Sequence, residues 1–215
     1  MTTDNQTIAL TGLFVTALVT AQVLGSKLVP IAIPAIGTAI VPAGTIAYAL
    51  TFFASDVMAE TQGKAAARRM VNVGFAMNFV LLALVWVAIA APVSEAGIPQ
   101  EPFASVLGAS ANIIAGSLVA YLVSQHWDVT AFHAIGRRTG GRWLWARNLG
   151  STATSQAIDT VLFTSVAFVI APIVFGVGHG VPLPVAVSIA VGQYVAKAIL
   201  AVVDTPFVYA AVRHV

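Results

Sequence analysis

Long apolar runs, broken by short polar stretches, dominate the pattern of residues along the chain. A helix needs about 20 mostly apolar residues to cross the hydrocarbon core of a bilayer. The segments that meet this requirement are 8–29, 39–58, 71–91, 104–126, 149–175 and 183–211. The pattern therefore predicts an all-α integral membrane protein with six transmembrane helices, in which residues 1–215 form a single six-helix domain.

The second of these segments is the least regular. It follows a stretch rich in Pro and Gly, residues 30–42, which the sequence leaves open as a re-entrant segment or an outer loop. The first segment has no Lys or Arg before Lys27, whereas a secretory signal needs a basic start. We therefore expect the first segment to be retained as a membrane helix.

Composition strengthens this assignment. Hydrophobic residues make up 59% of the 215 positions and charged residues 8%, against about 25% charge in soluble domains. Such a chain lacks the charged shell of a soluble enzyme and the basic face of a nucleic-acid binder. Because it contains no cysteine, disulfides and thiolate metal sites are excluded as well.

Basic residues predict the orientation of the domain. Eight of the 10 Lys and Arg residues lie in three places that share one side of a six-span protein: Lys64, Arg68 and Arg69, then Arg137, Arg138, Arg142 and Arg147, and finally Arg213. The loops of the other side carry only Glu95 and Glu101. Since Lys and Arg concentrate in cytoplasmic loops, both termini are predicted to be cytoplasmic.

A second set of charges lies within the apolar segments or at their margins. It comprises Lys27, Asp56, Glu60, Asp128, Asp159, Lys197 and Asp204. A charge at the bilayer centre costs about 2.5–3.5 kcal/mol on insertion scales, so these residues should pair or face a polar interior. Asp159 lies ten residues into its segment, roughly 15 Å deep, and Lys197 lies fourteen residues from either end of the last one. We predict that Asp159 and Lys197 pair or border a common cavity; an ion pair that only locks two helices is the structural alternative.

Polar residues recur at helical spacing around these charges. The sequence Ser-Gln-x-x-Asp appears twice, at 124–128 and at 155–159, each followed by Phe four residues after the Asp. Single polar residues often join membrane helices by hydrogen bonds, but acidic and polar stripes on four segments indicate a solvated cavity. A purely structural subunit would leave the deep charges unexplained.

Several of these stretches are also the basis of a family resemblance. They are TFFASDVMAETQGKAAAR at 51–68, SQHWDVTAF at 124–132, LWARNLGSTATSQAIDT at 144–160 and QYVAK at 193–197. With Pro42-Ala-Gly44 they make the chain similar to the queuosine-precursor transporter family, also called the vitamin uptake transporter family. Gln62 departs from the aromatic residue that this family commonly carries two positions after the Glu of the second segment.

The resemblance implies a multi-pass transporter of the cytoplasmic membrane that imports a 7-deazaguanine base such as preQ0, preQ1 or queuine. Such a base presents two N–H donors beside a carbonyl, which suits carboxylate, amide and ammonium groups, with aromatic side chains for stacking. The predicted substrate-binding residues are Asp159, Gln156, Asn148 and Lys197, then Asp128, Gln125 and Ser155, with Asp56, Glu60 and Asp204 as candidates for the cytoplasmic route or for proton transfer. Which carboxylate meets the base is left open.

The remaining expectations concern mechanism and partners. The chain has no phosphate-binding loop, so it either works alone, with protons as a candidate coupling ion, or serves as a substrate-binding subunit of a separate energising complex. We expect no enzymatic activity, cofactor, metal or nucleic-acid partner. The expected partners are a small-molecule substrate, the lipid bilayer and, as an open alternative, a second copy of the chain.

Overall fold

The computed structural model of the protein describes residues 3–33, 37–140, 144–176 and 180–213. The chain is mostly helical, with one short β-hairpin near its beginning. In chain order the elements are α1 (Thr3–Leu24), β1 (Leu28–Ile33), β2 (Gly37–Pro42), α2 (Thr45–Gln62), α3 (Lys64–Ala90), α4 (Gln100–Arg138), α5 (Leu144–Ser165), the π-helical turn η1 (Val166–Ile170), α6 (Ala171–Phe175) and α7 (Leu183–Arg213).

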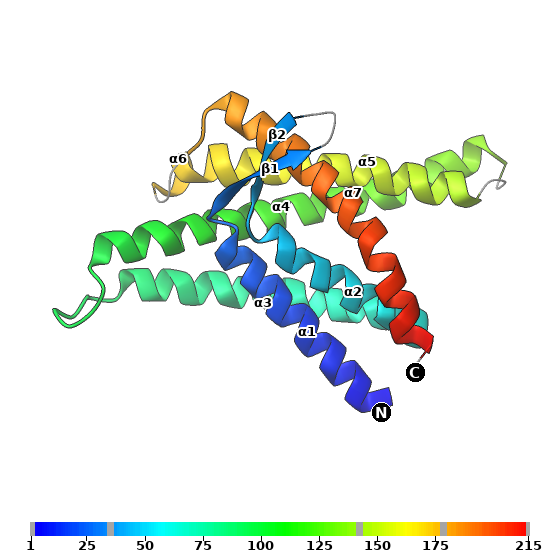
Figure 1. The fold of residues 1–215 in the computed structure, drawn as a ribbon, viewed down its shortest axis with the longest axis horizontal. Helices are drawn as coiled ribbons and strands as arrows, with labels where there is room; N and C mark the ends of the chain where they lie inside the picture. Colours follow the sequence, from blue (N-terminus) through cyan, green and yellow to red (C-terminus); the bar gives the residue numbers. More distant parts are fainter. Residues whose placement is uncertain (1–2, 34–36, 141–143, 177–179, 214–215) are drawn as a thin grey trace.

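The helices run back and forth between two ends of the molecule. Figure 1 shows both chain termini, the α2–α3 junction, the end of α4 and the start of α5 at one end. The α3–α4 loop and α6 lie at the opposite end. Because of this up-and-down path, the loops that the sequence predicted to share one side of the protein lie at the same end of the molecule.

Five helical stretches within the described residues are long and apolar enough to cross a membrane: Asp4–Leu24, Ala65–Ala90, Gln100–Ser124, Gly150–Phe175 and Leu183–Leu200. The helix α2 is not among them; it has 18 residues and carries Asp56 and Glu60. The prediction of an apolar, multi-helix membrane protein therefore agrees with the structure, whereas a sixth span and the cytoplasmic termini remain predictions.

The hairpin changes the boundaries of the first two predicted segments. The segment 8–29 was expected to be helical throughout, but α1 ends at Leu24, and α2 begins only at Thr45 rather than at 39. Between them β1 and β2 pair antiparallel, with Leu28 opposite Pro42 and Ile33 opposite Gly37. Valine and isoleucine favour strands, and in a two-stranded sheet both strands are edges, where proline is tolerated. The Pro-rich stretch is therefore a β-hairpin.

The hairpin lies close against α7, and the turn that leads from it into α2 lies close against α1. The N–H of Ile40 donates to Ser188 Oγ of α7 at 3.3 Å. A Cβ atom at Gly192 of α7 would stand 2.6 Å from the carbonyl oxygen of Ile40, and one at Gly44 would overlap the Ala21 backbone of α1. Glycine at both positions lets backbones approach closely, so β2 packs against α7 and the start of α2 packs against α1.

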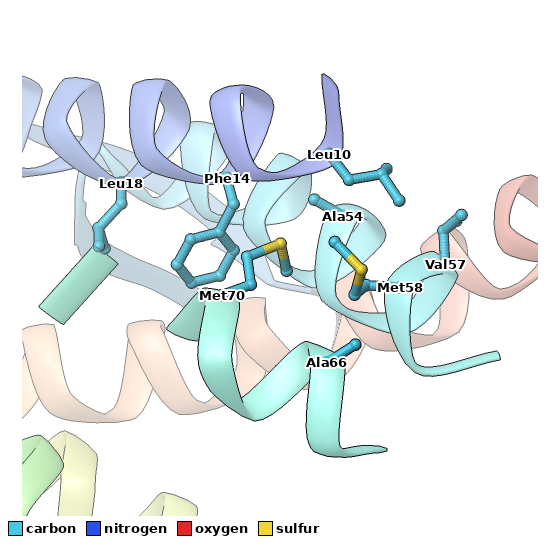
Figure 2. Packing of buried hydrophobic residues seen from close by; sticks show 8 residues of the cluster. All are labelled: Leu10, Phe14, Leu18, Ala54, Val57, Met58, Ala66 and Met70. Atoms are coloured by element: carbon cyan, nitrogen blue, oxygen red, sulfur yellow. The ribbon is translucent and has the colours of Figure 1, made fainter. Parts of the chain in front are cut away.

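Two apolar clusters form the core. The first joins α1, α2 and α3 and consists of Leu10, Phe14, Leu18, Ala54, Val57, Met58, Ala66 and Met70, which Figure 2 shows. The second joins α4, α5, η1 and α7 and consists of Ile113, Ala120, Phe163, Ala167, Phe168 and Ile189. The helices thus form two groups around two cores, α1 to α3 and α4 to η1 with the start of α7, and Val208 and Ala211 near the end of α7 pack against the first core.

Candidate functional site

A cavity of about 230 Å³ lies where the two groups of helices meet. Phe14 and Leu18 of the first apolar cluster and Ala120 and Phe163 of the second all line it. The polar side chains of its lining are Gln22, Thr45, Tyr48, Thr51, Ser55, Asn78, Ser117, Tyr121, Ser124, Gln156, Asp159, Gln193 and Lys197. These residues come from α1, α2, α3, α4, α5 and α7, so the cavity depends on the packing of all the long helices.

An ion pair lies in the wall of the cavity. Lys197 Nζ of α7 lies 2.8 Å from Asp159 Oδ2 of α5, and the two side chains are only 16% and 22% exposed. The other carboxylate oxygen, Asp159 Oδ1, accepts a hydrogen bond of 3.3 Å from Ser124 Oγ of α4. The pairing of these two residues, expected from their depth in the sequence, is confirmed.

Helical spacing explains which neighbours reach the cavity with the pair. Gln156 precedes Asp159 by three residues, and Gln193 precedes Lys197 by four. Residues three or four apart lie on one face of a helix, and all four side chains line the cavity. The structure therefore brings together Asp159, Gln156 and Lys197 of the predicted substrate-binding residues.

Three other predicted residues lie elsewhere. Asp56 and Glu60 are exposed on α2 and do not line the cavity. Ser155 is buried, and its hydroxyl donates to the carbonyl oxygen of Thr152 at 3.0 Å. The side chains of the remaining four, Gln125, Asp128, Asn148 and Asp204, lie outside the described residues.

Aromatic rings add flat apolar surface to the cavity. The rings of Phe75 and Tyr121 lie 4.7 Å apart between centroids, with 35° between their planes. Those of Tyr48 and Phe52 lie 6.4 Å apart, and all four residues line the cavity. Aromatic faces beside a few polar groups are typical of sites for small planar solutes.

Sequence reasoning missed two amides of the cavity, Gln22 of α1 and Asn78 of α3. Both are buried and line the cavity together with Ser117, whose hydroxyl donates to Gln22 Oε1 at 3.2 Å. The signal was a lone amide within a long apolar run. It is weaker than that of a charge because a neutral amide in a membrane helix often serves only to join helices.

A second cavity, of about 250 Å³, lies beside the hairpin. Ile113, Ala167 and Phe168 of the second apolar cluster line it, while Phe163 and Ala120 of the same cluster line the first cavity. The described structure therefore has an apolar layer between the two cavities.

Comparison with known protein families assigns this chain to one of them. Residues 42–211 match the family described as "Putative vitamin uptake transporter". This chain belongs to the vitamin uptake transporter family. The resemblance read from the sequence motifs is thereby confirmed, and the family assignment agrees with a multi-pass membrane protein.

A curated relative supports the family assignment. The "Probable queuosine precursor transporter" of Bacillus subtilis (strain 168) is 34% identical over 174 residues, which are 80% of this chain and 72% of the relative. No solved structure matches the chain. The part that matches the vitamin uptake transporter family includes Asp159 and Lys197, whereas Gln22 lies before it.

Proposed function

We propose that this protein is a transporter of the cytoplasmic membrane that imports a queuosine precursor, a 7-deazaguanine base such as preQ0, preQ1 or queuine. The observation that carries the proposal is the cavity that contains the Asp159–Lys197 pair and is lined by all the long helices. The name of the Bacillus relative, "Probable queuosine precursor transporter", points to the same class of solute.

The chemistry of the cavity suits such a base. Asp159 Oδ1 has lone pairs beyond the one that Ser124 uses, so it can accept an N–H of the guanine-like edge. Lys197 has three N–H donors and uses one toward Asp159, which leaves donors for the carbonyl of the base. The volume lies just below the range of about 300–1,000 Å³ that holds drug-sized ligands, so a small solute is favoured.

We further propose that α2 is the sixth span and that both termini are cytoplasmic. Its 18 residues extend about 27 Å at 1.5 Å per residue, close to the hydrocarbon thickness of about 30 Å. Arg68 and Arg69 near the start of α3 and Arg137 and Arg138 at the end of α4 are exposed at the end of the molecule that also holds both termini. Asp56 and Glu60 are proposed to border the route on that side.

The orientation is testable because the chain has no cysteine. Ala65 and Ala96 are both exposed, near the start of α3 and in the α3–α4 loop. We expect Ala96→Cys to react with a membrane-impermeant maleimide on intact cells, and Ala65→Cys to react only after the membrane is opened. Labelling of Ala65→Cys on intact cells would show that the topology is the reverse of the proposed one.

Uptake of radiolabelled preQ0 or queuine by vesicles that contain only the purified protein tests the function. We expect uptake well above that of empty vesicles, with saturation and with competition by the unlabelled base. Binding without uptake would favour a substrate-binding subunit that depends on a separate energising complex. If the protein shows no binding of these bases by calorimetry and no uptake, the proposal that it transports them is wrong.

A further inference from the structure

Three side-chain amides of the cavity each contain an atom without a hydrogen-bond partner among the described residues. They are Gln22 Nε2, Asn78 Oδ1 and Gln193 Oε1. The three side chains are 0%, 4% and 6% exposed, and they come from α1, α3 and α7. All three line the cavity that holds the Asp159–Lys197 pair.

Helix joining does not account for these atoms. A polar residue that joins membrane helices does so by bonding across the interface, and a buried polar atom left unbonded costs free energy instead of contributing it. Among the described residues, Gln22 is bonded at one end only, because its Oε1 accepts from Ser117 while its Nε2 has no partner there. A polar group that is costly for the fold, in a residue that lines a cavity, is typical of a ligand-binding residue.

The charges of the cavity define the kind of ligand. Among the described residues of its lining, Asp159 and Lys197 are the charged ones, and they neutralise each other at 2.8 Å. A charged ligand would bring an unbalanced charge into a partly buried site, which is unfavourable. Neutral amides, by contrast, offer donors and acceptors without adding charge.

We propose that Gln22, Asn78 and Gln193 are specificity-determining residues that read an uncharged planar base presenting both hydrogen-bond donors and an acceptor. This inference rests on the proposed function and deepens it. The Nε2 amide of Gln22 donates to the carbonyl of the base, while Asn78 Oδ1 and Gln193 Oε1 accept from its N–H groups. Among 7-deazaguanines, the neutral nitrile is favoured over the cationic aminomethyl form.

The test replaces each amide by an apolar residue of similar size, as Gln22→Met, Asn78→Leu and Gln193→Met. Binding of preQ0 to the purified protein is measured by calorimetry and thermal stability by melting without ligand. We expect each variant to bind at least tenfold more weakly, equal to about 1.4 kcal/mol. Asn78→Leu and Gln193→Met should melt at the wild-type temperature or higher, whereas Gln22→Met also loses the hydrogen bond from Ser117 and should melt slightly lower. A purely structural role of Asn78 or Gln193 would instead lower the melting temperature of its variant.

The chain offers a matched control in Gln62. Its Nε2 is also buried and unpaired among the described residues, and its Oε1 accepts from Thr7 at 2.7 Å, but it does not line the cavity. Gln62→Met should leave the affinity for preQ0 within twofold of wild type. Equal losses in Gln62→Met and the three cavity variants would overturn the proposal.

A second measurement determines which group of the base forms hydrogen bonds with the amides. An analogue of preQ0 that lacks the exocyclic amino group removes one donor without changing the shape of the rings. We expect the wild type to prefer preQ0 at least tenfold, and Asn78→Leu or Gln193→Met to lose most of that preference. Unchanged preference in both variants refutes the inference alone, whereas a wild type that binds no 7-deazaguanine refutes the proposed function itself.

Discussion

We expect Asp159→Asn to abolish uptake of the base while the protein still inserts into the membrane. Asparagine has nearly the same shape, and its amide oxygen accepts hydrogen bonds as the carboxylate oxygens do from Lys197 and Ser124. The negative charge is lost, however, so Lys197 is left without its counter-charge and the base meets one acceptor where there were two. A hydrogen bond to a charged group contributes about 1.5–3 kcal/mol, so initial uptake should fall at least tenfold, toward the level of empty vesicles.

The same measurement needs a control for the removal of a carboxylate. Asp4 is exposed in the first turn of α1 and does not line the cavity, so Asp4→Asn should transport normally. Gel filtration in detergent checks that Asp159→Asn is still folded. Normal transport by a folded Asp159→Asn variant would show that the cavity around this residue is not the transport site.

The second large effect is a coupling between Asp159 and Lys197. Lys197→Met leaves the partly buried carboxylate of Asp159 with Ser124 as its remaining hydrogen-bond partner among the described side chains. Breaking a buried ion pair costs about 3–5 kcal/mol, and the partial exposure of this pair reduces the expected cost to about 1–3 kcal/mol. The double variant with Asp159→Asn should regain most of that stability, because replacing both partners removes the unpaired charge.

A double-mutant cycle on the melting temperature measures this coupling. The double variant should be more stable than the sum of the two single changes predicts. Simple additivity would mean that the 2.8 Å contact has no energetic role. Recovery of stability without recovery of uptake would separate the ion pair's part in the fold from its part in transport.

Much of the fold could be predicted from the pattern of residues alone. Hydrophobic length is a local property, so the apolar part of each long helix was predicted, apart from the region around the hairpin. The polar ends were not, because α3 begins at Lys64 rather than at 71 and α4 continues to Arg138 rather than ending at 126. The hairpin region was ambiguous because proline and β-branched residues disfavour a helix without specifying what replaces it. The strand pairing of residues 28–33 with 37–42 depends on contacts with α7, such as the one at Gly192, which no local pattern reveals.

The candidate site, like the fold, could be predicted only in part from the sequence. The sequence by itself determined the class of protein and the family motifs. It also indicated that Asp159 and Lys197 pair or border a common cavity, because a charge deep in an apolar run is costly unless it has a partner or a polar surrounding. Only the tertiary structure decided that Asp56 and Glu60 face away from the cavity and that Gln22 and Asn78 face into it. The rotation of each helix is set by packing of its apolar side chains against its neighbours. A neutral amide costs less free energy in a membrane helix than a charge does, so it can lie on a face that packs against a neighbouring helix or on one that lines the cavity. Its role therefore becomes clear only from the packed arrangement of the helices.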